Sequence, residues 1–558
     1  MSGAWRLFTN FHSPAPRWPT ALKLAAALVV PAAVALLLGL DQEMLLIAAG
    51  GYSVVYGEGL PLRTRWRSIL TAGVFIVMAS MAGAFVGTVT WNEIAGDGTS
   101  WWLLLIVVYT TILAALGTFC QNALRLPPPG SFFIVMVGGG STMVARLGLN
   151  PVDVGFWAIF GVLSALVMGV GPLLFHRRAP QYRAVAVLEK AVEDFINAPQ
   201  PAIAKNHQAQ AALADTWATL SDAGVVRGGR IQDASQADLV RRTVAAHHRL
   251  VNASTMAPAR EKESQLTETP SYVDLSRNAI PHSRPSHLYR IYRSIHPYSH
   301  ATITTCKVIL ASLLAGTITI ALGFDRPDWT VVSAMLVLQW GPDKLPGTIR
   351  GLHRLLGSLL GIILFGAFHM LGVHGWTLLA AIAVCQFCAE IFVTRNYALC
   401  VIFATPLALL MGNSIALPLL PVVTSRVCEV FFAILFSLLF LWLWMPNSEP
   451  KHYARLVDRC YRAMGSLLGA LMTMPPNEAL AQRRDLQYEL LAERRAVTSL
   501  VANHPASRTS TWPQHTSIQE AGYALLDYCT AHADEELSLT ELSQLTTKIR
   551  EARTTTKF

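Results

Sequence analysis

Apolar runs separated by short polar turns dominate two stretches of the chain, and a polar region follows each stretch. A helix of about 20 apolar residues spans a bilayer, whose hydrocarbon core is about 30 Å thick. Because backbone polar groups find no water in that core, such runs predict membrane helices. The expected segments are 21–40, 44–56, 69–90, 101–118, 132–146 and 154–175, then 303–323, 329–340, 352–371, 376–393, 397–413 and 423–445.

This pattern predicts an all-α polytopic membrane protein with about 12 transmembrane helices in a 6+6 arrangement. The polar regions mix Ala, Leu, Glu, Gln and Arg at amphipathic spacing, which predicts further helices outside the membrane. The expected domains are a six-helix repeat at 1–175, a cytoplasmic helical region at 176–300, a second six-helix repeat at 301–445 and a C-terminal cytoplasmic helical region at 446–558.

The two apolar halves are predicted to be copies of one another. An ungapped offset of 284 residues aligns Lys23 with Lys307 and Gly73 with Gly357. Six helices per half would begin and end each half on the same side, so the repeats should be related by an axis along the membrane normal. The pair Gly83-x-x-x-Gly87 in the first half, like Gly357-x-x-x-Gly361 in the second, predicts close helix contact.

Two of the runs are too short to cross a bilayer. The run Trp329 to Trp340 covers about 18 Å as a helix before Gly341-Pro342 stops it, and the run 44–56 in the first half is equally short. The fifth segments are interrupted by Gly138-Gly139-Gly140 and by Thr405-Pro406. Equivalent short or broken helices indicate a substrate path, because their free backbone groups need a wet or protein-lined cavity. The alternative is ordinary spans with boundaries drawn too tightly.

Composition agrees with a membrane protein. Of the 558 residues, 53% are hydrophobic and only 14% are charged, against about a quarter charged in soluble proteins. The net charge is +9, and the basic residues that produce it cluster beside apolar segments, as expected at a cytoplasmic membrane face. Nucleic acid is therefore not an expected partner. With the N-terminus inside, the cytoplasmic turns carry Arg63, Arg65, Arg67, Arg125, Lys344, Arg350, Arg354 and Arg395. Both termini and both polar regions are therefore expected in the cytoplasm, with the protein in the inner membrane.

A set of motifs in the second half resembles a known family. These motifs are Trp329-Thr330, Leu338-Gln339, Arg350-Gly351, RLLGSLLG from Arg354 to Gly361, Arg395-Asn396-Tyr397-Ala398 and FATPLAL from Phe403 to Leu409. They resemble the fusaric acid resistance (FUSC) family, which includes aromatic acid exporters. The resemblance covers about 296–445, with a weaker copy at 12–175 that has Gly130-Ser131-Phe132 in place of the Arg-Asn-Tyr motif. It implies efflux of anionic, often aromatic, compounds.

Candidate substrate-binding residues follow from the short segments and from these motifs. Arginine offers a planar fork that binds a carboxylate bidentately. For the arginines, the alternative is a role in topology or in contacts with phospholipid headgroups. The candidates are Gln339, Trp340, Arg354, Arg395, Asn396 and Pro406.

Acidic residues inside apolar segments are candidates for proton coupling. Glu390 and Glu429 lie in the tenth and twelfth segments, where a carboxylate can carry a proton. Arg426 precedes Glu429 by three residues on the same helix face, so those two charges could simply neutralise each other. Glu390 has no such partner on its own helix.

Sequence motifs of enzymes are missing. The chain contains no GxxxxGK[ST], HExxH or GxSxG motif, so no catalytic residue, metal or cofactor is expected and any driving energy should come from an ion gradient. The expected function is secondary export of an organic anion. The alternatives are a passive anion channel and a non-transporting scaffold for cell-envelope machinery. Expected partners are the lipid bilayer, a small organic anion, and a second copy or an envelope protein.

Overall fold

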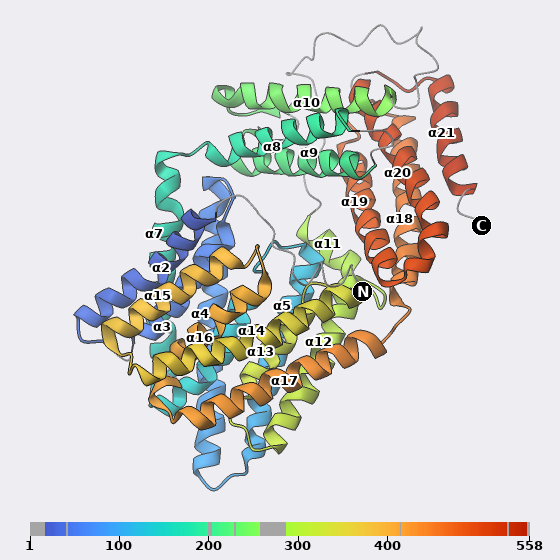
Figure 1. The fold of residues 1–558 in the computed structure, drawn as a ribbon. Helices are drawn as coiled ribbons and strands as arrows, with labels where there is room; N and C mark the ends of the chain where they lie inside the picture. The colour runs from blue at the N-terminus through green and yellow to red at the C-terminus, as the bar shows by residue number, and fades with distance from the viewer. Residues whose placement is uncertain are drawn as a thin grey trace. The chain divides into compact units, whose positions relative to one another are not determined.

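The computed structural model describes residues 17–40, 43–198, 203–227, 230–256, 286–412, 414–532 and 535–554 (Figure 1). Within them the chain is helical apart from one short hairpin, β1 (Val226–Arg227) paired antiparallel with β2 (Arg230–Ile231). The chain separates into two compact units. The membrane unit comprises Met1–Glu58, Arg65–Pro172 and Arg290–Pro446, and the polar unit comprises Gly59–Thr64, Leu173–Tyr289 and Asn447–Phe558.

The helices of the two apolar halves follow one another in the expected order. In the first half they are α2 (Trp18–Leu37), α3 (Met44–Gly51) continued by η1 (Tyr52–Gly57), α4 (Leu62–Ala95), η2 (Ser100–Leu103) with α5 (Leu104–Leu124), α6 (Phe132–Gly140) continued by η3 (Ser141–Leu147), and α7 (Pro151–Phe175). In the second they are α12 (His300–Ala321), α13 (Pro327–Leu338), α14 (Lys344–Met370), α15 (Gly375–Phe392), α16 (Tyr397–Met411), η6 (Ser414–Ala416) and α17 (Leu419–Leu443). The helix α11 (His287–Ser294) precedes them.

Among the described residues, eight helices are long and apolar enough to cross a membrane: α2, α4, α5 with η2, α7, α12, α14, α15 and α17. Four apolar helices are shorter: α3 with η1, α6 with η3, α13 and α16. The short helices occupy the second and fifth places of each half. The all-α membrane fold is confirmed, whereas the count of 12 crossings and the 6+6 repeat stay predictions.

Side-chain contacts show which way the short helices run. Lys23 near the start of α2 pairs with Glu58, directly after η1, at 2.8 Å between Nζ and Oε1. The α3–η1 segment therefore returns to the level at which α2 begins. In the second half, positions 357 and 361 of α14 lie against positions 398 and 405 of α16, so these two helices run parallel.

Glycines let α4 approach its neighbour closely. A Cβ atom on Gly83 would lie 2.1 Å from the carbonyl oxygen of Gly138, and one on Gly87 would lie 2.0 Å from that of Thr142. Gly357 and Gly361 play the same part between α14 and α16. The predicted close contact at both Gly-x-x-x-Gly pairs is confirmed, because no side chain fits in either gap.

The polar unit holds two groups of helices, each with its own apolar core. Leu188, Leu213 and Leu250 lie in the first core, and Leu467 and Leu490 lie in the second. The helices are α8 (Ala179–Ile196), α9 (Ile203–Ala223), η4 (Ala234–Gln236) and α10 (Ala237–Met256), then α18 (Ser448–Leu471), α19 (Leu480–Asn503), η7 (Pro505–Ser507), α20 (Arg508–Ala531) and α21 (Leu539–Thr554).

Candidate functional site

A cavity of about 650 Å³ lies inside the membrane unit. All four short helices contribute to its wall, through residues such as Leu45 of α3, Phe133 of α6, Leu336 of α13 and Leu407 of α16. The sequence predicted a substrate path among these same segments. The cavity gives that path a location, while its use by a substrate stays a prediction.

The cavity extends along the whole of α13. Arg326 and Trp329 line it at the start of this helix, and Gln339 and Trp340 line it just beyond the end. Twelve residues of α-helix rise about 18 Å, which is shorter than the hydrocarbon core of a bilayer. Polar side chains at both ends of this short helix therefore line the cavity. In a full-length span the same side chains would lie near the membrane surfaces.

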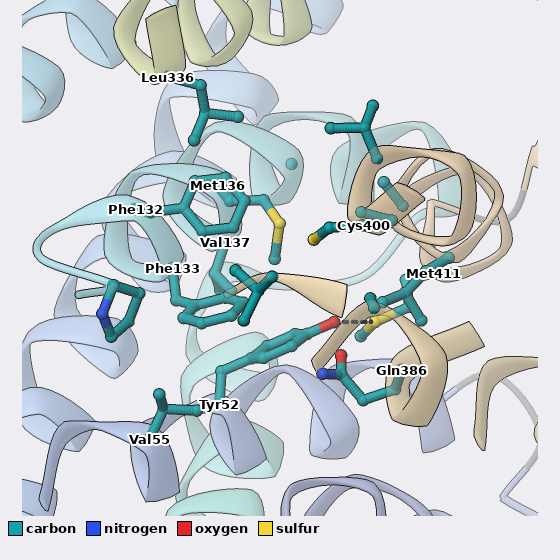
Figure 2. Close-up of a pocket in the computed structure, with 18 of the residues that line it drawn as sticks. Tyr52, Val55, Phe132, Phe133, Met136, Val137, Leu336, Gln386, Cys400 and Met411 are labelled. Atoms are coloured by element: carbon teal, nitrogen blue, oxygen red, sulfur yellow. Dashed lines mark hydrogen bonds between the residues drawn. The ribbon is translucent and has the colours of Figure 1, made fainter. Parts of the chain in front are cut away.

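The middle of the cavity is aromatic and apolar. The ring of Tyr52 stacks on that of Phe133, with centroids 4.3 Å apart and planes tilted by 15°. Its hydroxyl group donates to the sulfur of Met411 at 3.0 Å, as the dashed line in Figure 2 marks. This contact joins η1 of the first half to the end of α16 in the second. Met136 and Val137 of α6 lie beside it in Figure 2.

Charged groups at the cavity wall are mostly cationic. Glu390 is the single carboxylate among the described residues of the wall. Such a wall favours an anionic guest over a cationic one. The five arginines of the wall are Arg17, Arg326, Arg350, Arg354 and Arg426.

Arg354 lies inside the membrane unit and not on a turn, which corrects the expectation from sequence. The helix α14 begins at Lys344, so Arg354 is about 15 Å along it. Its Nη2 donates to the hydroxyl of Ser333 in α13 at 3.2 Å, and Tyr397 is within hydrogen-bonding reach. Within the described residues Arg354 has no carboxylate partner, and its buried Nε makes no hydrogen bond. Arg350, one turn earlier, also belongs to this helix and not to a turn.

Gln339 and Trp340 line the cavity as well. The backbone carbonyl of Gln339 accepts a hydrogen bond from Nδ2 of Asn122 at 2.9 Å, which fixes the end of α13 to α5. Its side-chain Oε1 is buried without a hydrogen bond from any described group. Contact of Gln339 and Trp340 with a substrate stays a prediction.

Three other candidates do not reach the cavity wall. Asn396 caps α16, since its Oδ1 accepts hydrogen bonds from the backbone of Ala398 at 2.9 Å and Leu399 at 3.4 Å. Arg395 directly precedes this cap. Pro406 is buried within α16, which continues through it unbroken, and it packs beside Gly361 of α14. The cap and the packing position are structural roles that the sequence motif by itself could not distinguish from binding.

Glu390 has a partner that its own helix does not supply. Its Oε1 lies 2.8 Å from Nη2 of Arg17, directly before α2. Arg17 is about 370 residues away along the chain, so no helical spacing could have indicated the pair. Both residues line the cavity.

Glu429 and Arg426 belong to a buried charged cluster at the start of α13. Arg326 forms two hydrogen bonds of 3.2 Å with the carboxylate of Asp328. Arg426 lies over Trp329, with Cζ 4.2 Å from the ring centroid, and its Nη1 is 3.8 Å from Glu429. The sequence indicated the Arg426 and Glu429 spacing and missed the other pair, although Arg-x-Asp at the start of a short helix was a visible signal.

Residues 309–440 match the protein family described as fusaric acid resistance protein-like. The chain is a membrane protein, and this segment of it resembles that family. It is also 23% identical to a Bacillus subtilis (strain 168) protein named uncharacterized membrane protein YvaC, over 590 residues that cover 96% of this chain and 89% of that protein. No solved structure matches the chain.

The fusaric acid resistance-like match holds most of the charged cavity wall. Arg326, Arg350, Arg354, Glu390 and Arg426 all lie within the matched residues, and so do α13 and α16. The stacked rings of Tyr52 and Phe133 come instead from the first half of the chain, which precedes the matched residues.

The polar unit contains a buried hydrogen-bonded network of its own. Nδ1 of His515 lies 2.8 Å from the carboxylate of Glu493, and Nε2 of Gln519 donates to the same carboxylate at 2.6 Å. Burial lowers the pKa of the nearby His207 to about 3, so this ring is neutral at physiological pH. The network ties α19 to α20. Across the described ranges no three His, Cys, Asp or Glu side chains are arranged to hold a metal ion.

Proposed function

We propose that this protein is a secondary transporter that exports organic anions, aromatic ones included, across the cytoplasmic membrane through the cavity along α13. The observation that carries the proposal is Arg354, a buried guanidinium at the cavity wall with no carboxylate partner among the described residues. A charge buried in a membrane is costly unless it is paired. A bound carboxylate would supply the missing partner.

The rest of the wall suits an anion that has an apolar body. Tyr52 and Phe133 offer an aromatic surface on the same cavity wall as the arginines, and Gln339, whose side-chain Nε2 can donate to a carboxylate, lines that wall as well. A volume of about 650 Å³ is within the range of pockets for small organic ligands. In this proposal Arg354 and Gln339 contact the substrate, while Glu390 or the pair of Arg426 and Glu429 couples its movement to protons.

Flux measured in proteoliposomes tests this function. We expect Arg354→Gln to reduce the flux of radiolabelled benzoate under an imposed pH gradient by at least tenfold, because a charge-assisted hydrogen bond contributes about 1.5–3 kcal/mol. The control is Arg67→Gln, which removes an exposed arginine at the start of α4 that does not line the cavity. Benzoate flux at the wild-type level in Arg354→Gln would contradict the proposal.

The same vesicles separate the proposal from the two alternatives. A passive anion channel would carry benzoate only along its own electrochemical gradient, with no added flux when a pH gradient is imposed. A scaffold would carry none of the anion in either condition. Either result would overturn secondary export.

A further inference from the structure

Arg426 presents a second guanidinium to the cavity, separate from Arg354. It is 2% exposed, and its Nε and Nη1 atoms make no hydrogen bond with any described group. Within the described residues its one ion pair is with Glu429, at the long distance of 3.8 Å, because the nearby Asp328 is bound by Arg326. Ser425 holds the same carboxylate by a hydrogen bond of 2.6 Å. Arg426 is therefore loosely paired.

The donors of the neighbouring Arg326 are not free to bind an anion. Its Nε and Nη2 both bind the carboxylate of Asp328, in the fork geometry that an arginine uses for its strongest pairs. Of the two arginines at this end of the cavity, Arg426 is thus the one whose donors are open to an incoming anion.

The two open arginines are close to each other along α13. Arg354 contacts Ser333, and Arg426 lies over Trp329, four residues earlier on the same helix. Four residues of α-helix rise about 6 Å, which is roughly the width of a carboxylate with its hydrogen bonds. An anion could move from one guanidinium to the other without losing both at once.

We propose that Arg426 forms a second anion-binding position, next to that of Arg354 along α13, and that the carboxylate of Glu429 occupies it when no transported anion is present. This inference rests on the proposed function and extends it, because it divides the path into two successive positions. An arriving carboxylate displaces Glu429 from Arg426. When the anion leaves, Glu429 returns and keeps the guanidinium paired.

Trp329 provides a direct reporter of this position. Iodide quenches tryptophan fluorescence on contact, and an iodide ion bound at Arg426 would lie beside the ring over which this guanidinium sits. The Trp329 signal is the difference in tryptophan fluorescence between the purified full-length protein and its Trp329→Phe variant. At constant ionic strength we expect saturable quenching of that signal by iodide, relieved by benzoate. Quenching that rises linearly without saturation would overturn the proposal.

Two substitutions assign the effect to Arg426 and Glu429. In Arg426→Gln, we expect the apparent iodide affinity at Trp329 to fall at least tenfold, and an unchanged affinity would overturn the proposal. Glu429→Gln removes the competing carboxylate and should raise the iodide affinity several-fold. This variant keeps the test decisive if Arg426→Gln does not fold, because equal or weaker binding in Glu429→Gln also contradicts the proposal.

Failure of the second position can be told apart from failure of the transport function. Absent benzoate flux in the wild type, together with the expected quenching, would reject transport and retain the anion position. Normal benzoate flux with iodide quenching that neither substitution changes would reject the position and retain transport.

Discussion

The ion pairs formed by buried charges in the membrane unit differ in tightness. Arg326 with Asp328, and Arg17 with Glu390, have donor and acceptor atoms within 3.2 Å. Arg426 and Glu429 are 3.8 Å apart. Tight pairs lower the cost of burying charge, whereas loose ones leave donors free for a ligand. Accordingly, the tightly paired Glu390 is proposed for proton coupling and the loosely paired Arg426 for anion binding.

Glu390 is the residue for which coupling can be tested most directly. Glu390→Gln keeps the shape of the side chain but cannot bind or release a proton, so we expect benzoate flux driven by a pH gradient to fall to the level without the gradient. Benzoate movement along its own gradient should persist. The measurement is flux in proteoliposomes with and without an imposed pH difference.

Arg17→Gln is the matched control for Glu390→Gln. It breaks the same 2.8 Å ion pair but leaves the carboxylate able to titrate, so flux driven by the pH gradient should remain. Unchanged pH-driven flux in Glu390→Gln would exclude this residue as the coupling group and leave the role to Glu429.

At the scale of helices, the short segments create the cavity and the glycines hold their neighbours in place. The four short helices stand among eight long ones, and each contributes to the cavity wall. The helix α4 fixes α6 and η3 through Gly83 and Gly87, whose surfaces meet backbone atoms of the short segment. Because backbone atoms cannot move aside as a flexible side chain can, this contact tolerates no added methyl group.

Substitution of Gly87 tests that packing. Gly87→Ala would place a Cβ atom 2.0 Å from the carbonyl oxygen of Thr142, so we expect a loss of about 1–3 kcal/mol in stability. The measurement is the thermal midpoint of the detergent-purified protein, with its monodisperse fraction. Gly366→Ala in α14 is the control, since nothing lies within 4 Å of its added Cβ. A midpoint for Gly87→Ala equal to that of Gly366→Ala would show that the helices can separate at low cost.

At the scale of the whole molecule, the orientation of the protein in the membrane defines which direction of transport is export. The distribution of basic residues along the sequence predicts that both termini and the polar unit lie in the cytoplasm. The loop between α4 and η2, which contains Asp97, should then face outward.

Cysteine labelling of intact cells tests that orientation. In a background without the eight native cysteines, a membrane-impermeant maleimide should label Asp97→Cys and should not label Asp458→Cys, which is exposed on α18. Labelling of Asp458→Cys should appear once the cells are permeabilised. Labelling of both positions in intact cells would contradict the cytoplasmic placement of the polar unit.

The sequence by itself determined the all-α membrane fold, the positions of the apolar helices and the short lengths of the second and fifth helix in each half. These features are local, because the length of an apolar run and the residues that stop it can be compared directly with the thickness of a bilayer. It also indicated Arg354, Gln339 and Glu390, all of which line the cavity.

Tertiary structure decided what surrounds each of these residues. Arg17 meets Glu390, and Tyr52 meets Met411, across more than 350 residues of chain. Asn396 shares a motif with Arg395 but serves as a helix cap. Whether a guanidinium is paired with a carboxylate or open to a ligand depends on which distant helix packs beside it. Local spacing carries no information about that neighbour, and only the packed helices supply it.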